Sequence, residues 1–242
     1  MDFKKAHWSI KDGQEYENYL DSIKGSEFSR GWEKRIVCTN LPTMSIKTAV
    51  VNDIVKDILK GDYQSFLDIF LLNNHTETII FAKVLSGAIE RAGGLRDYKD
   101  LLCKFCASVD NWASIDGIKF CVKDENKDEF WALAREFVES DKTFVRRAGY
   151  RIFFSFASDA EYIKNAFTLI EKAYDEKEYY VNMCISWFLC ECFIKNREVT
   201  LEFLKNGKLN KFVKNKTISK CCDSFRVSNE DKDLLRTLRI VD

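Results

Sequence analysis

Proline and glycine are scarce in this sequence, with one proline and ten glycines among 242 residues. So few turn formers argue against a loop-rich all-β fold and favour helices joined by short turns. The chain also lacks any run of about 18 uncharged apolar residues, the length that a transmembrane helix needs. Its first residues, M-D-F-K-K-A-H-W, lack the apolar stretch of a signal peptide. We therefore expect a soluble, cytoplasmic protein with no membrane partner.

Histidine is also scarce, and the arrangement of cysteines matches no zinc motif. Cys103 and Cys106 form one C-x-x-C, but no second such pair follows, and His7 and His75 are distant in sequence. The nine cysteines are expected to be reduced, and those in apolar helical segments resemble small buried hydrophobic residues. These cysteines are Cys190, Cys192, Cys221 and Cys222. We expect no metal site and no cofactor.

The net charge is zero, but the charges are unevenly distributed. Residues 1–140 carry 19 basic and 23 acidic side chains, so the excess of positive charge lies in residues 141–242. The segment 205–220 holds six lysines and no acidic residue. Such a cluster is either a solvated helix face or a patch that follows DNA phosphates. Composition leaves both interpretations open.

Helical periodicity recurs along nearly the whole chain and predicts an all-α fold. In segment 45–60, apolar residues repeat at helical spacing after a possible cap at Ser45, and Gly61 ends the pattern. Similar segments follow: 63–72, 76–90, 95–106, 110–122, 128–139, 142–157, 159–173, 178–194, 197–206, 208–220 and 227–239. We predict one domain over 1–242, with about the first 30 residues as an N-terminal helical extension.

Two of these segments are similar at a shift of 36 residues. T-F-V-R-R-A-G-Y-R-I-F-F (143–154) aligns with Y-Y-V-N-M-C-I-S-W-F-L-C (179–190), so Phe144 falls on Tyr180. This period lies at the short end of the range for HEAT-like helical pairs, which stack into a curved α-solenoid with a concave face. We predict that fold.

The same alignment gives each repeat a pair of residues outside its apolar core stripe. A stripe of Val181, Cys184, Ile185, Phe188 and Cys192 leaves Met183 and Trp187 off the core of the last repeat. The corresponding pair one repeat earlier is Arg147 with Arg151, and one further step back, with a one-residue slip, the pair is Trp112 with Asp116. Residues four apart share a helix face, so these pairs predict a site on one concave surface. The alternative is that both tryptophans cover the core and the charged residues are solvated.

Three segments resemble the AlkD-like DNA alkylation repair enzymes, a family of HEAT-repeat DNA glycosylases. They are V-D-N-W-A-S-I-D, F-V-R-R-A-G-Y-R and Y-Y-V-N-M-C-I-S-W-F-L, and the segment near 41–54 is loosely similar to an early family motif. The resemblance covers most of residues 30–225 and implies removal of 3-methyladenine and 7-methylguanine from duplex DNA. The partner that it implies is alkylated double-stranded DNA. We expect a monomer, because a solenoid with a polar outer face needs no second chain.

The resemblance implies roles for four of the six off-stripe residues. Asp116 would be the catalytic carboxylate, Trp112 and Trp187 would flank the lesion, and Arg147 would contact a phosphate. We add Arg151 from the shared face. The lysine cluster supplies four further DNA-binding candidates, namely Lys208, Lys211, Lys214 and Lys216. An alkylated purine is a cation and already a good leaving group, so a carboxylate that stabilises the oxocarbenium-like sugar suffices.

Several positions depart from the family pattern. Cys190 replaces an arginine, Met183 stands where lysine is common, and Lys47 replaces an arginine. Each lost phosphate contact weakens DNA binding. A second hypothesis therefore remains, in which the chain is a catalytically degenerate HEAT-repeat scaffold that binds DNA or another protein.

Overall fold

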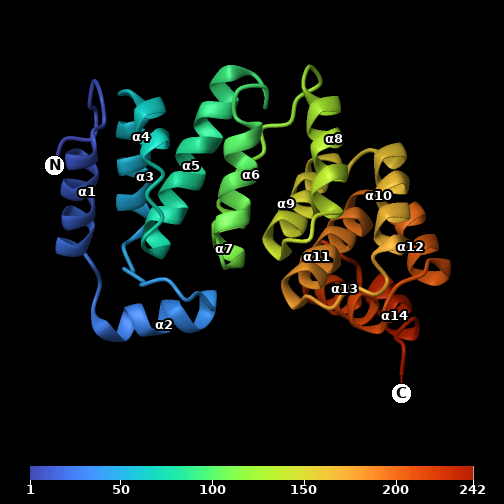
Figure 1. Cartoon of the computed structure of the whole chain (residues 1–242). Helices are drawn as coiled ribbons and strands as arrows, with labels where there is room; N and C mark the ends of the chain where they lie inside the picture. Colours follow the sequence, from blue (N-terminus) through green and yellow to red (C-terminus); the bar gives the residue numbers. More distant parts are fainter. Residues whose placement is uncertain (242) are drawn as a thin grey trace. The chain divides into compact units, whose positions relative to one another are not determined.

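The computed structural model describes residues 1–241, and they form helices and connecting loops with no strand (Figure 1). The predicted all-α class is therefore confirmed. The chain divides into two compact units, residues 1–126 and 127–242. No helix within the described residues is both long enough and apolar enough to cross a membrane.

The first unit is organised around α5, the longest helix of the chain. Helices α3, α4 and α7 each pack against α5. The helices of this unit are α1 (Ile10–Ser22), α2 (Glu27–Val37), α3 (Thr48–Ile58), α4 (Tyr63–Ile69), α5 (His75–Ala92), α6 (Lys99–Ser108) and α7 (Trp112–Asp116). Helix α5 ends at Gly93, whose φ of 77° is a left-handed conformation that glycine adopts without strain.

The second unit consists of stacked helical pairs, as the 36-residue period predicts. Helices α9, α11 and α13 pack in series, α8 packs on α9, and α12 packs on α11. Their bounds are α8 (Lys127–Val138), α9 (Thr143–Phe153), a 3-10 turn η1 (Phe154–Phe156), α10 (Ala160–Lys172), α11 (Tyr179–Lys195), α12 (Arg197–Asn206), α13 (Lys211–Asp223) and α14 (Asn229–Thr237).

Ring contacts confirm the register of the repeat in this unit. The rings of Phe144 and Tyr180, which the 36-residue shift pairs, lie 5.8 Å apart between α9 and α11. The predicted core stripe of α11 is also confirmed, because its five residues are each at most 1% exposed. Cys190, Cys192 and Cys221 are buried as expected, whereas Cys222 is only partly buried.

Two local predictions are wrong. Ser45 does not cap α3, which begins at Thr48 after Lys47. Ser45 instead adopts a φ of 51°, and its N–H donates to the Glu33 carboxylate at 2.7 Å. The helix expected over 110–122 ends at Asp116, because the next segment runs back along α5 and its Lys119 N–H donates to Ser86 Oγ at 2.9 Å.

Candidate functional site

Helix α7 begins at Trp112 and ends at Asp116, so the predicted pair stands on one helix at a spacing of four residues. Both side chains are partly buried. The helix begins there because the Asn111 side chain accepts the Ser114 N–H at 2.9 Å, which satisfies a donor of the first turn. The Trp112 indole N–H donates to the Ile36 carbonyl at the end of α2, at 3.3 Å.

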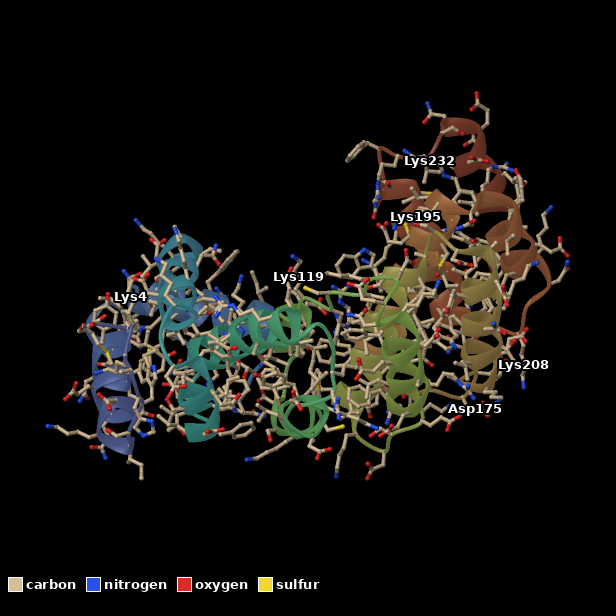
Figure 2. All side chains as sticks on the ribbon, turned by 90° about the horizontal axis from the view of Figure 1, so that it is seen from above. Lys4, Lys119, Asp175, Lys195, Lys208 and Lys232 are labelled. Carbon is tan, nitrogen blue, oxygen red and sulfur yellow. The ribbon has the colours of Figure 1, made fainter. Side chains whose placement is uncertain are left out.

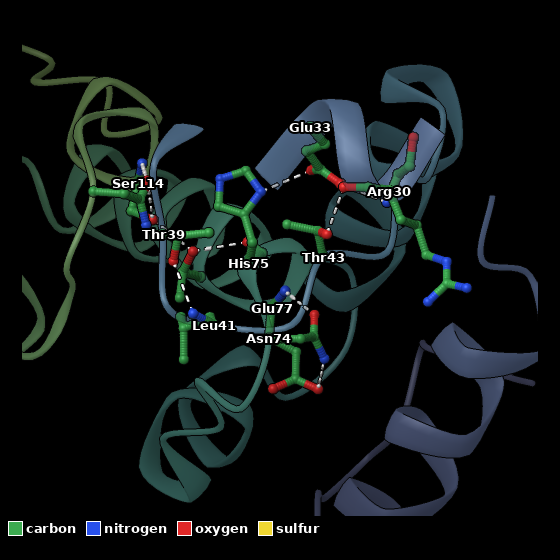
Figure 3. Close-up of polar contacts among 12 residues, drawn as sticks. Arg30, Glu33, Thr39, Leu41, Thr43, Asn74, His75, Glu77 and Ser114 are labelled. Carbon is green, nitrogen blue, oxygen red and sulfur yellow. Dashed lines mark hydrogen bonds and ion pairs between the residues drawn. The ribbon is translucent and has the colours of Figure 1, made fainter. Parts of the chain in front are cut away.

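Buried hydroxyl groups fix α7 on α5. Ser114 Oγ and Thr78 Oγ1 lie 2.6 Å apart, and the Thr78 hydroxyl also donates to the His75 carbonyl at 2.7 Å (Figure 3). Both Ser114 and Thr78 are fully buried. Because buried hydrogen bonds have few alternative partners, they hold a short helix that could not be stable alone.

Asp110 attaches the loop after α2 to the start of α7. Its carboxylate accepts the Thr39 hydroxyl and the Asn40 N–H, both at 2.6 Å. Burial acts to raise the pKa of Asp110, but these hydrogen bonds and one from Asn111 outweigh it and lower the pKa below its usual range. Asp110 is thus a second carboxylate near Trp112, with a positioning role that the sequence pattern did not indicate.

A partly buried hydrogen-bond network holds the other end of the same loop. His75 Nδ1 lies 2.8 Å from Glu33 Oε1, and the second Glu33 oxygen accepts the Ser45 N–H (Figure 3). Glu33 comes from α2 and His75 from the first turn of α5. Helices α2, α5 and α7 are therefore connected by polar contacts around the Trp112–Asp116 pair.

Glu77 on α5 has an unusually high pKa. Glu77 is 1% exposed, and this burial raises the pKa of its carboxyl group to about 7. The Asn73 N–H and the Asn74 side chain each donate a hydrogen bond to the carboxylate at 2.6 Å, and these bonds only partly offset the effect of burial. A carboxyl group whose pKa is higher in the folded state binds its proton more tightly there. The contribution of Glu77 to the free energy of unfolding must therefore fall as the pH rises from about 4.5 to about 7.

We predict that Glu77→Gln flattens this part of the pH dependence. Above pH 7, the substitution removes the cost of ionising the buried Glu77 carboxyl group. That cost is roughly 3 kcal/mol when the whole pKa shift is counted. Glutamine keeps an acceptor for the Asn73 N–H but loses one for Asn74, so part of the gain is offset. Denaturant unfolding at pH 5, 6, 7 and 8 measures the effect. Glu17→Gln is the control, because Glu17 makes only a smaller contribution to the Glu77 pKa; an unchanged slope in Glu77→Gln would refute the assignment.

In the second unit, Trp187 lies among cations. The Arg151 guanidinium is 5.2 Å from the Trp187 ring centre and 4.5 Å from that of Phe154, and Lys220 Nζ is 5.8 Å from Trp187. The Phe154 ring meets Trp187 edge-on at 5.2 Å. We call Arg151, Phe154, Trp187 and Lys220 the Trp187 cluster. Trp187 is 37% exposed, so the cluster presents an aromatic surface flanked by positive charge.

Arg147 is buried, in contrast to the exposed position that the repeat alignment indicates. It is 4% exposed, and its Nη1 donates to the Tyr180 carbonyl at 2.6 Å. Tyr180 lies in the first turn of α11, so this bond connects α9 to α11. The long side chain reaches between the two packed helices, which a one-dimensional repeat pattern does not reveal. This geometry is that of a positioning residue.

The four lysine candidates occupy different surroundings. Lys208 lies near Asp175 (Figure 2), with its Nζ 4.7 Å from the Tyr174 ring centre, and its backbone N–H donates to Glu171. Lys211 and Lys216 line a groove of about 500 Å³ on α13. The other two candidates, Lys208 and Lys214, are not among the residues that line this groove.

The structure brings Arg151 and Trp187 together, and it keeps Trp112 with Asp116. The first pair belongs to the second unit and the other to the first unit. Sequence reasoning missed Phe154 and Lys220 as neighbours of Trp187, although Lys220 is the last lysine of the 205–220 cluster. Within residues 1–241, no three His, Cys, Asp or Glu side chains gather as a metal-binding group.

A comparison with models of known protein families gives a match. The model of the protein family described as "DNA alkylation repair enzyme" matches residues 14–221, which include α7, α9, α11 and most of α13. No curated protein matches the chain.

Proposed function

The chain belongs to the DNA alkylation repair enzyme family, and from this premise we propose that it is a DNA glycosylase for cationic alkylated purines. Its substrates would be 3-methyladenine and 7-methylguanine in duplex DNA, and its products a free base and an abasic site. The observation that carries the proposal is the Trp112–Asp116 pair on α7, a helix that begins and ends at these two residues and is fixed by buried hydrogen bonds.

Asp116 has the chemistry that the reaction needs. Departure of an alkylated purine leaves positive charge on the deoxyribose, and a nearby carboxylate stabilises that charge and orients the attacking water. The water adds to the anomeric carbon as the bond to the purine nitrogen breaks, and its proton passes to the carboxylate or to solvent. The purine carries its bonding electrons away as a neutral base, so no protonating acid is required.

The two tryptophans would have different roles. The Trp112 indole N–H is bonded to Ile36, which fixes the ring so that its face is available to a cationic base or sugar edge. Trp187 has Arg151 and Lys220 near its ring, and those charges repel a cationic purine and attract phosphate. We therefore assign Trp187, Arg151 and Lys220 to contacts with the DNA backbone, and Arg147 to positioning α11.

The test of this function is identification of the released bases. The protein is incubated with duplex DNA treated with a methylating agent, and the soluble fraction is analysed by mass spectrometry beside a protein-free control. The proposal predicts 3-methyladenine and 7-methylguanine above the spontaneous level. Release equal to the control, from protein shown to be folded by circular dichroism, would refute it.

Trp187→Ala is predicted to weaken duplex binding on the order of tenfold, about 1.4 kcal/mol. The substitution removes the aromatic surface that orients Arg151 and Lys220. Fluorescence anisotropy on an undamaged duplex measures the change. The control is Phe225→Ala in the same unit, because Phe225 is 95% exposed; equal affinities of the two variants would contradict the role given to the Trp187 cluster.

A catalytically degenerate scaffold is the second candidate, and Cys190 favours it. This residue replaces an arginine of the family pattern and is 4% exposed on α11, so it offers DNA no charge. Salt dependence separates the kinds of scaffold: a DNA binder loses affinity steeply as salt rises, and a protein-binding scaffold has almost no affinity for a nonspecific duplex to lose.

A further inference from the structure

The groove of about 500 Å³ on α13 is lined by six residues, none of which is acidic. Lys211, Phe212, Asn215, Lys216 and Ser219 come from one side of α13, and Arg239 comes from the C-terminal segment after α14. Three of the six are cations. A groove lined by charge of one sign concentrates its field and attracts an anionic ligand.

The C-terminal segment is fixed on α13 by specific hydrogen bonds. The Asn215 side chain bonds both backbone groups of Ile240, donating to its carbonyl at 2.9 Å and accepting its N–H at 2.9 Å. Arg239 Nη2 donates to Ser219 Oγ at 3.0 Å. These bonds place Arg239 over α13, so the groove has two walls.

Helix α14 is itself anchored by an ion pair. The Arg197 guanidinium on α12 contacts Asp231 on α14, with Nε 2.8 Å from Oδ1, and this contact lowers the pKa of Asp231. Arg226, in the loop between α13 and α14, pairs with Glu191 on α11. The family match ends at residue 221, so Arg239, which follows α14, adds a wall to the groove from outside the matched region.

The groove adjoins the Trp187 cluster along one helix. Lys216 lines the groove and Lys220 lies against Trp187, and residues four apart share a helix face. Their separation along the axis is about 6 Å, less than two base steps of a DNA strand at about 3.4 Å each. One strand can therefore meet both cations in succession.

Phe212 gives the groove an apolar end. Its ring is 40% exposed and lies 5.8 Å from the ring of Tyr179, which is 54% exposed. Aromatic side chains interleaved with cations are typical of surfaces that bind nucleic-acid strands, where rings contact sugars or bases and cations contact phosphates.

We propose that the groove between α13 and the C-terminal segment binds the phosphate backbone of the DNA strand that continues from the Trp187 cluster. Lys216 and Arg239 each contact a phosphate, Asn215 and Ser219 position Arg239, and Phe212 contacts the sugar edge. The inference rests on the proposed function for the identity of the ligand as duplex DNA, and it extends the binding surface beyond the family match.

The test is salt-dependent binding of an undamaged fluorescent 20-base-pair duplex, chosen as the probe because it needs no catalysis. The variant Lys216→Ala/Arg239→Ala is compared with Lys205→Ala/Arg236→Ala, which removes two exposed cations from α12 and α14 outside the groove. Two lost phosphate contacts lower the slope of log affinity against log salt by about 1.8. We expect that change and at least tenfold weaker binding in the groove variant alone.

Two further comparisons sharpen the result. Arg239→Lys keeps the charge and is expected to retain the slope, whereas Asn215→Ala releases Ile240 and is expected to weaken binding. Equal slopes in the groove and control variants would overturn the proposal, and so would absence of wild-type binding to the duplex. Duplex binding that depends on the groove, together with no base release, would refute the glycosylase and leave the groove assignment standing.

Discussion

Asp116→Asn is expected to lower the single-turnover rate of 7-methylguanine release by at least about 10²-fold. Asparagine has nearly the same shape as aspartate but carries no charge, so it cannot stabilise the cationic sugar or accept a proton from water. Asp116 is the last residue of α7, and the hydrogen bonds made by Asn111, Ser114 and Thr78, which help to fix this helix, are unchanged in the variant. The helix should therefore stay in place.

The matched control is Asp97→Asn, which removes an exposed carboxylate from the same unit. Both variants are measured at saturating protein, so that a change in DNA affinity does not imitate a change in rate. Wild-type rates in Asp116→Asn would assign catalysis to another residue. A lower rate accompanied by a lower unfolding temperature would indicate damage to α7.

Gly149→Ala is expected to lower the stability of the protein by about 3 kcal/mol. Gly149 lies where α9 crosses α8, and an added Cβ would lie 2.8 Å from both the Val138 backbone N and Val138 Cγ1 and 2.9 Å from the Ala134 carbonyl oxygen. Two of these three atoms are backbone, so α8 and α9 must move apart. Thermal unfolding should shift down by about 6–12 °C.

Gly31→Ala is the matched control for this substitution. Gly31 lies in α2, and a Cβ there would meet no atom within 4 Å. Alanine should stabilise α2 by about 0.5–1 kcal/mol, because glycine is the poorer helix former. Opposite signs for the two variants would confirm close packing of α8 on α9, and a similar small effect in both would contradict it.

The helical architecture could be predicted from the sequence because apolar periodicity is a local property. The stripe of α11 predicted which side chains are buried, and it placed Trp187 off the core, where it is 37% exposed. The pairing of Phe144 with Tyr180 followed from the same periodicity. The placement of Trp112 and Asp116 on one helix is likewise confirmed.

The burial of individual polar side chains and the contacts between distant segments could not be predicted from periodicity. Helical periodicity predicts on which face of α9 Arg147 lies, but not which groups surround its side chain. The side chain reaches between two helices and donates to the Tyr180 carbonyl. Arg239 lies against α13 because the segment after α14 bonds to residues that are 20 or more positions earlier in the sequence.

The most direct test of the central claim is abasic-site formation in a duplex that contains a single 7-methylguanine. Wild-type protein is supplied in excess, and strand scission after alkaline treatment reports the abasic sites against a protein-free control. The proposed function predicts first-order formation well above the spontaneous rate. Formation at the spontaneous rate by folded protein that binds the duplex would contradict it and would make α7 part of a DNA-binding scaffold.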